Sequence, residues 1–131
     1  RPGDLYIIIY VEEHELFQRQ GTDILCEIPI SSILAALGGE VTIPVLDGKV
    51  KLKIPAGTQS GKVFRIRGKG IPRLHGYGRG NHYVRVIVEV PVRLSEEERR
   101  LLRKLSEAGN GRIFPLTSAF AKKIKRFFPS D

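Results

Sequence analysis

The chain has 131 residues, of which 41% are hydrophobic, so it has room for one cored domain with attachments but hardly for two full domains. Its longest uninterrupted apolar runs, such as residues 7–9, are far shorter than the roughly 20 residues of a membrane-spanning helix. The formal net charge of +8 could attract nucleic acid, an acidic membrane surface or an acidic partner. The single cysteine, Cys26, excludes an internal disulfide, and the three scattered histidines add no zinc-like spacing, which favours the cytosol.

Alternation of apolar and polar residues with a period of two predicts a mainly β fold. The expected strands are residues 4–11, 23–28, 40–46, 49–54, 62–67 and 83–90. Asp47-Gly48 connects two of these strands, and this dipeptide suits the positive φ angles of a type I′ hairpin turn. Together the segments predict a small β-sandwich or open barrel.

Serine and glycine mark the ends of two predicted helices. In residues 29–39, serine precedes a short apolar run and glycine follows it, which predicts a short helix that plugs one end of the sheet. Farther along, Ser95 and Glu98 have the spacing of a capping box, and Gly109 ends the second helix. The apolar stripe of this second helix contains Leu101, Leu102 and Leu105. That stripe needs a partner, either the chain's own sheet or a second subunit.

A third, amphipathic helix is expected from about residue 118 to residue 128, as part of a tail tethered by Asn110-Gly111 and Pro115. Its apolar face consists of Phe120, Ile124, Phe127 and Phe128, and its basic face of Lys122, Lys123, Lys125 and Arg126. The apolar face suits packing on a partner, and the whole helix also suits an anionic lipid surface.

An internal similarity suggests how the chain is organised. Residues 3–11 resemble residues 80–88, with the glycine, a tyrosine and the alternating aliphatic residues retained. We therefore expect residues 1–16 to be the last strand of an earlier, truncated β-domain, and residues 17–92 to be one complete copy. Residues 93–109 then form the helix with the leucine stripe, and residues 110–131 form the basic tail.

No motif indicates an enzyme or a metal site. The three histidines lie on different predicted segments, and no nucleophile-elbow pattern is present. The glycine-rich stretch 76–80 resembles a phosphate-binding loop, but a strand follows it instead of a helix, so turn formation explains it better. A rival interpretation is a basic nucleic-acid-binding β-domain that uses Arg67, Lys69, Arg73, Tyr77 and Arg79.

A resemblance to a known family rests on residues 44–72, whose sequence is PVLDGKVKLKIPAGTQSGKVFRIRGKGIP. This stretch is similar to the second C-terminal domain of DnaJ-type co-chaperones. The flanking sequences AALGGE at 35–40 and GYGRGN at 76–81 fit the same family, as does the entry at residues 1–6. The tail at 120–128 resembles the short Phe/Lys ends of bacterial members.

The resemblance implies a scaffold without enzymatic activity. In this family, two tandem β-rich domains hold unfolded client polypeptides, and a C-terminal element joins two subunits into a V-shaped dimer. Clients pass to a DnaK-type ATPase, which an N-terminal J-domain stimulates. The homodimer contact would include Leu94, Leu101, Leu102 and Leu105, with Phe120, Ile124, Phe127 and Phe128 packing as a tail.

The same resemblance limits what these residues are expected to do. The chain contains neither the His-Pro-Asp tripeptide of a J-domain nor the CxxCxGxG repeats of the family's zinc-binding region. Zinc is therefore expected only upstream, and no cofactor is expected in this chain. The principal peptide groove of relatives lies in the first C-terminal domain, so no client-binding residues are assigned. A cytoplasmic location is expected, and neither a membrane nor nucleic acid is expected as a partner.

Overall fold

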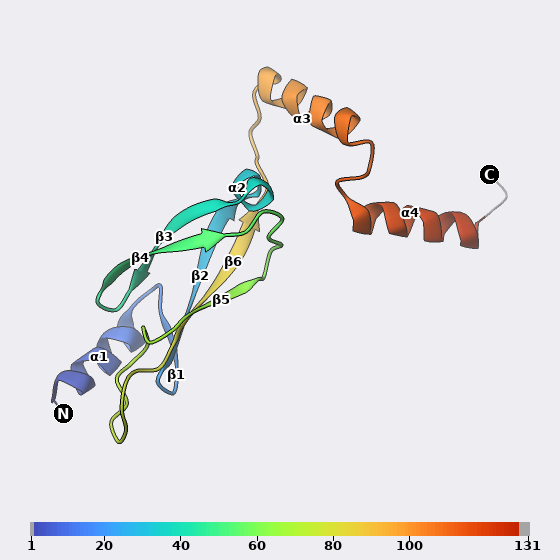
Figure 1. Cartoon of the computed structure of the whole chain (residues 1–131). Helices are drawn as coiled ribbons and strands as arrows, with labels where there is room; N and C mark the ends of the chain where they lie inside the picture. The colour runs from blue at the N-terminus through green and yellow to red at the C-terminus, as the bar shows by residue number, and fades with distance from the viewer. Residues whose placement is uncertain (1, 129–131) are drawn as a thin grey trace. The chain divides into compact units, whose positions relative to one another are not determined.

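The computed structural model describes residues 2–128, with side chains from residue 7 onward. Residue 1 and residues 129–131, which belong to the predicted segments 1–16 and 110–131, lie outside the described residues. The chain divides into two compact units, Arg1–Pro91 and Val92–Asp131. The elements, in chain order, are α1 (Pro2–Glu13), β1 (Gln18–Gln20), β2 (Asp23–Ser31), α2 (Ser32–Leu37), β3 (Gly39–Val45), β4 (Gly48–Ile54), β5 (Val63–Ile66), β6 (His82–Glu89), α3 (Glu96–Gly109) and α4 (Pro115–Phe127) (Figure 1).

Four strands of the first unit form one sheet in the order β1-β2-β6-β5 (Figure 1). Its centre is the parallel pair β2 and β6, which runs from Ile24 opposite His82 to Ser31 opposite Glu89. β5 adds an antiparallel edge to β6, and β1 adds a short antiparallel edge to the start of β2. A parallel pair requires a long crossover, and here α2, β3, β4 and β5 lie between its two strands in the chain.

The strands β3 and β4 form a separate antiparallel hairpin that packs on one face of this sheet. Ile43 and Ile54 of the hairpin belong to the same buried cluster as Ile24, Val84 and Val86 of the sheet, and each is at most 1% exposed. The prediction of a mainly β, sandwich-like fold is therefore confirmed. So are the strands predicted at 23–28, 40–46, 49–54, 62–67 and 83–90, within a few residues at each end.

The short helix α2 packs against β2 and β6, as the predicted plug would. The Ser31 hydroxyl accepts a hydrogen bond from the backbone N–H of Leu34 at 3.0 Å and so caps the helix. Gly38 ends it with a φ of 81°, where a Cβ would lie 2.8 Å from the backbone nitrogen of Ala56. Glycine is needed here both for its left-handed conformation and for this close approach.

The hairpin turn lies one residue earlier than predicted. Val45 pairs with Gly48, so Leu46 and Asp47 form the turn. Among these residues only Gly48 has a positive φ, at 140°, and the type I′ conformation predicted for Asp47-Gly48 is wrong. The carboxylate of Asp47 instead forms ion pairs with Lys69 and Arg79. These residues are distant in the sequence, so the turn preference of the dipeptide Asp47-Gly48 could not predict the contact.

The strand predicted at residues 4–11 is also wrong, because Pro2–Glu13 forms the helix α1. A strand needs a neighbouring strand for its backbone hydrogen bonds, and within residues 2–128 no strand is available beside this segment. A helix forms those hydrogen bonds within itself. Residues 80–88, which the segment resembles, do form β6. Residues 2–13 thus form no strand here, and the assignment of residues 1–16 to an earlier, truncated domain stays a prediction.

The second unit contains α3 and α4, and α3 begins with the predicted capping box. The hydroxyl of Ser95 accepts a hydrogen bond from the Glu98 N–H at 3.1 Å, and the Glu98 carboxylate accepts one from the Ser95 N–H at 2.7 Å. α4 begins with Pro115 at its first turn, three residues before the predicted start.

The connection between the two helices is held by hydrogen bonds within it. Asn110 ends α3 in the left-handed conformation, and the Arg112 N–H donates to the Gly109 carbonyl at 2.9 Å. The Ser118 hydroxyl then donates to the Gly111 carbonyl at 2.7 Å. The segment predicted as a simple tether is thus a defined turn.

Candidate interaction surfaces

The leucine face of α3, defined as Leu101, Leu102 and Leu105, is exposed. The three side chains are 51%, 40% and 53% accessible, although leucine is usually buried. They share one side of the helix because residues three and four apart are neighbours on a helix. Leu94, the fourth residue predicted for this surface, precedes the capping residue and is half-buried. The structure therefore brings together three of the four predicted residues.

The remaining surface of α3 is charged and balanced. Four acidic residues and four basic residues lie between Glu96 and Glu107. Glu97 accepts a hydrogen bond from Arg100 at 2.9 Å, and this bond holds the pKa of Glu97 below its usual value. Backbone and side-chain hydrogen bonds from Ser95 likewise lower the pKa of Glu98. The acidic first turn also complements the positive end of the helix dipole.

The apolar face of α4 is exposed as well. Phe120, Ile124, Phe127 and Phe128 are 62%, 42%, 74% and 66% accessible. Sequence reasoning missed Leu116, which is 81% accessible and continues this face toward the start of the helix. The signal was present in the sequence, because residues 113, 116, 120, 124 and 127 are apolar at spacings of three and four.

Ile113, at the start of that series, has a separate role. Its side chain packs on Gly109, where an added Cβ would lie 2.8 Å from the Ile113 Cδ1. Gly109 is buried as a result. The contact fixes the turn that leads out of α3, and it leaves the residues from Leu116 onward as the free apolar face of α4.

A further surface, which sequence reasoning did not find, is the open edge of β2. The N–H of Ile24 donates to the Asn81 carbonyl next to β6, so the backbone groups of Ile24 point toward β6. The N–H and C=O groups of the alternate residues of β2, such as Leu25 and Glu27, therefore point away from β6. β1 pairs with β2 only as far as Leu25. Within residues 2–128 no strand pairs with the outward groups of Glu27 and Pro29. A hollow of about 180 Å³ lies at this edge, lined by Glu15, Leu16, Gln18, Leu25, Cys26 and Glu27.

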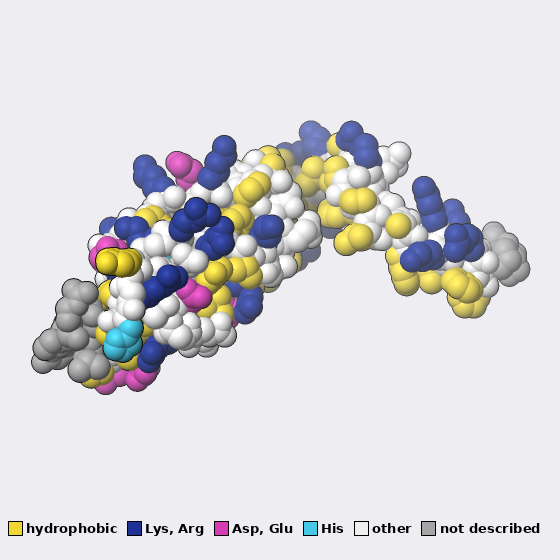
Figure 2. Space-filling view, turned by 60° about the horizontal axis from the view of Figure 1, so that its bottom comes forward, with side chains coloured by type: hydrophobic (Ala, Val, Ile, Leu, Met, Phe, Trp, Pro, Cys, Tyr) yellow, Lys and Arg dark blue, Asp and Glu magenta, His cyan; other side chains and the backbone are white. Residues whose placement is uncertain are grey.

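Basic residues also gather on the β-domain, where Figure 2 shows Lys and Arg side chains over one face. Residues 48–80 contain nine Lys and Arg and no Asp or Glu. Among the residues proposed for nucleic-acid binding, Lys69 and Arg79 meet at Asp47, with nitrogen–oxygen distances of 3.8 and 3.6 Å. Arg67 and Arg73 are exposed, and Tyr77 is 98% accessible. Asp47 thus neutralises part of the positive charge of Lys69 and Arg79.

Neither a cluster of metal ligands nor a membrane-length helix occurs among the described residues. No three His, Cys, Asp or Glu side chains among them converge on a point where a metal ion would fit. None of the helices in this part of the chain combines the length and apolar character needed to cross a bilayer.

Comparison with known proteins identifies the family. The model of the "DnaJ C terminal domain" family matches residues 1–91. The chain belongs to the DnaJ C-terminal domain family. The resemblance found in residues 44–72 and their flanks is thereby confirmed.

Individual relatives of the DnaJ family extend the similarity through α3 and α4. The chain is 51% identical over 126 residues to the "Chaperone protein DnaJ" of Halalkalibacterium halodurans, which is 96% of this chain and 34% of that protein. It is 48% identical over 130 residues to the protein of the same name from Shouchella clausii, covering 99% and 35%. It is 49% identical over 126 residues to that of Halothermothrix orenii, covering 96% and 34%. The chain spans about a third of the length of these relatives.

Proposed function

We propose that this chain is the dimerising and client-holding part of a DnaJ-type co-chaperone. Two copies would join through the leucine face of α3, and each copy would hold a segment of an unfolded polypeptide. The full-length protein would then deliver the client to a DnaK-type ATPase. Membership of the DnaJ family supports the chaperone role, and the free thiol of Cys26 fits the reducing cytoplasm.

The observation that carries the self-association is the exposed leucine face. Burying one leucine fully is worth about 1.5–3 kcal/mol, so three half-exposed leucines on one helix favour a partner surface. A second copy supplies the same surface by two-fold symmetry. Since α3 carries equal numbers of acidic and basic residues, two α3 helices can approach without net repulsion.

The open edge of β2 supports a weak contact with an extended client. A peptide in line with β1, beyond its first residue Gln18, could pair with the N–H and C=O of Glu27, with the apolar side chains of Leu16 and Leu25 beside it. Pro29 lacks an N–H, so it limits this pairing and protects the edge from aggregation. A single short contact gives low affinity, and two contacts in one dimer raise the effective concentration.

The test compares a short labelled apolar peptide, which occupies one site, with a long unfolded polypeptide, which can occupy two. Leu102→Asp should weaken binding of the long client by at least about tenfold and leave the Kd of the short peptide unchanged. The matched control, Arg103→Asp, places the same residue on the opposite side of α3 and should change neither. Equal weakening of both ligands by Leu102→Asp, or no weakening of the long one, would count against the proposal.

A nucleic-acid-binding β-domain is the second candidate function, and one observation favours it. Residues 48–80 carry nine basic residues without an acidic one. Such a surface predicts binding that weakens steeply with salt. If single-stranded DNA is not retained on a filter at low salt, this alternative is excluded.

A further inference from the structure

We propose that α4 binds an anionic lipid surface and lies in the plane of the membrane interface. Its apolar face would enter the boundary between headgroups and acyl chains, and its lysines would contact the lipid phosphates. The proposal is independent of client holding. It departs from the expectation that no membrane acts as a partner of this protein.

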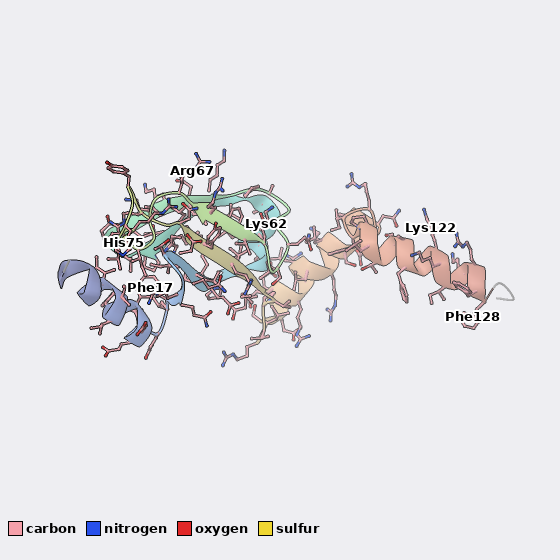
Figure 3. The ribbon with its side chains drawn as sticks, turned by 90° about the horizontal axis from the view of Figure 1, so that it is seen from below. Phe17, Lys62, Arg67, His75, Lys122 and Phe128 are labelled. Carbon is pink, nitrogen blue, oxygen red and sulfur yellow. The ribbon has the colours of Figure 1, made fainter. Side chains whose placement is uncertain are left out.

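The two faces of α4 are cleanly separated. Figure 2 shows hydrophobic side chains along one side of this C-terminal helix and Lys and Arg along the other. In Figure 3, Lys122 and Phe128 project to opposite sides of it. The apolar residues Leu116, Phe120 and Phe127 are 62–81% accessible. A helix with phenylalanines on one face and lysines on the other is typical of one that lies on a bilayer surface.

The charge of α4 selects the kind of partner. All of its ionisable residues are cations, and residues 108–128 contain none that is acidic. A second α4 would bring four more positive charges against these four. Elsewhere in the chain α3 is balanced and residues 48–80 are basic, whereas residues 2–47 contain eight acidic residues and one basic residue. Those carboxylates offer countercharge to the cations of α4, but a surface of anionic headgroups also places its countercharge directly over an apolar layer.

The apolar face of α4 distinguishes between a lipid surface and a nucleic acid as its partner. Phosphates of nucleic acid would satisfy the four cations and leave Leu116, Phe120 and Phe127 in water. An anionic bilayer satisfies both faces at once, because the phenylalanines enter the interface just beneath the charged headgroups. The combination of the two faces therefore points to lipid.

The experiment measures binding of the complete chain to vesicles by co-sedimentation. Vesicles of equal parts phosphatidylglycerol and phosphatidylcholine should retain the protein at low salt, and vesicles of phosphatidylcholine alone should not. Phe120→Ser combined with Phe127→Ser should lower the partition coefficient by at least about tenfold. Lys122→Gln combined with Lys125→Gln should lower it by about 25-fold, since each cation contributes about fivefold.

The matched control is Lys49→Gln combined with Lys51→Gln, which removes the same charge from β4. This variant should retain nearly all of the binding, and all variants should keep the circular dichroism of the parent chain. The proposal is overturned if the anionic vesicles do not retain the protein, or if the β4 variant loses binding as much as the α4 variants. It is also overturned if the phenylalanine variant dissociates a dimer and vesicle binding is absent, because a second copy would then cover this face.

Discussion

The sulfur of Cys26 lies 3.2 Å from Nε2 of His82, across the parallel pair β2 and β6. The two side chains are 2% and 0% exposed, and the ring of Phe17 meets the imidazole edge-on at 5.6 Å. Nδ1 of His82 is buried with no hydrogen-bond partner among the described residues. This buried site favours a neutral imidazole at His82 and a protonated thiol at Cys26. Each protonation state has a measurable effect on the protein.

Folding should weaken in acid because of His82. Burial lowers the pKa of His82 from its usual value of 6.5, so the unfolded chain binds the proton more readily than the folded chain. The contribution to stability is complete above pH 6.5 and decreases as the pH falls below that value. Urea unfolding followed between pH 7.5 and pH 5 should therefore show a falling midpoint.

The variant His82→Leu should flatten this pH dependence, because it removes the titrating group. His75→Leu, at an exposed position, serves as the control and should leave the dependence unchanged. A midpoint that falls just as steeply in His82→Leu would show that other groups are responsible.

The thiol of Cys26 should be unreactive in the folded protein. Burial raises its pKa to about 11, and the thiolate is the form that reacts. A disulfide reagent at pH 8 should label it slowly without urea and quickly once the chain unfolds. Because the folded pKa lies above the unfolded value of 9.0, stability should also decrease as the pH rises beyond 9. Rapid labelling without urea would contradict the buried position.

Gly80 should tolerate no side chain. A Cβ at this position would lie 2.1 Å from the carbonyl oxygen of Thr22, and backbone cannot move aside as a flexible side chain can. Gly80→Ala should reduce the free energy of unfolding by about 1–3 kcal/mol, the usual cost of overpacking. Gly76→Ala is the control, since a Cβ added at Gly76 would have no neighbouring atom within 4 Å. Equal urea midpoints for the two variants would be the contrary result.

Ser95 should stabilise the first turn of α3. Replacing it with alanine removes the hydrogen bond to the Glu98 N–H at 3.1 Å and should cost about 1 kcal/mol of helix stability. Amide exchange of Glu98 should accelerate by roughly fivefold, the equivalent of that free energy. Ser106→Ala, an exposed serine inside the same helix, should not accelerate it. Unchanged exchange in Ser95→Ala would indicate that the cap contributes little.

The elements that could be predicted from the sequence are those whose signals are local. The capping box of Ser95 and Glu98, the helix that follows Ser31 and the β3–β4 hairpin all depend on residues a few positions apart. The conformation of residues 4–11 depends instead on whether a strand lies beside them, and the alternation of their side chains carries no such information. The Asp47 turn was missed for a related reason, since its ion pairs reach Lys69 and Arg79.

The candidate surfaces divide in the same way. The leucine face of α3 and the phenylalanines of α4 follow from helical spacing, so the sequence was sufficient to find them. The open edge at Glu27 could not be found, because it depends on β6 lying parallel to β2 and on β1 beginning only at Gln18. The pairing of Cys26 with His82 depends on that same register.

Sedimentation equilibrium of the complete chain at tens of micromolar tests the central claim, that the leucine face of α3 joins two copies. We expect twice the chain mass of 14.7 kDa for the parent protein and for Arg103→Asp, and a single chain mass for Leu102→Asp. A parent protein that remains at 14.7 kDa, or a Leu102→Asp variant that stays dimeric, would contradict it.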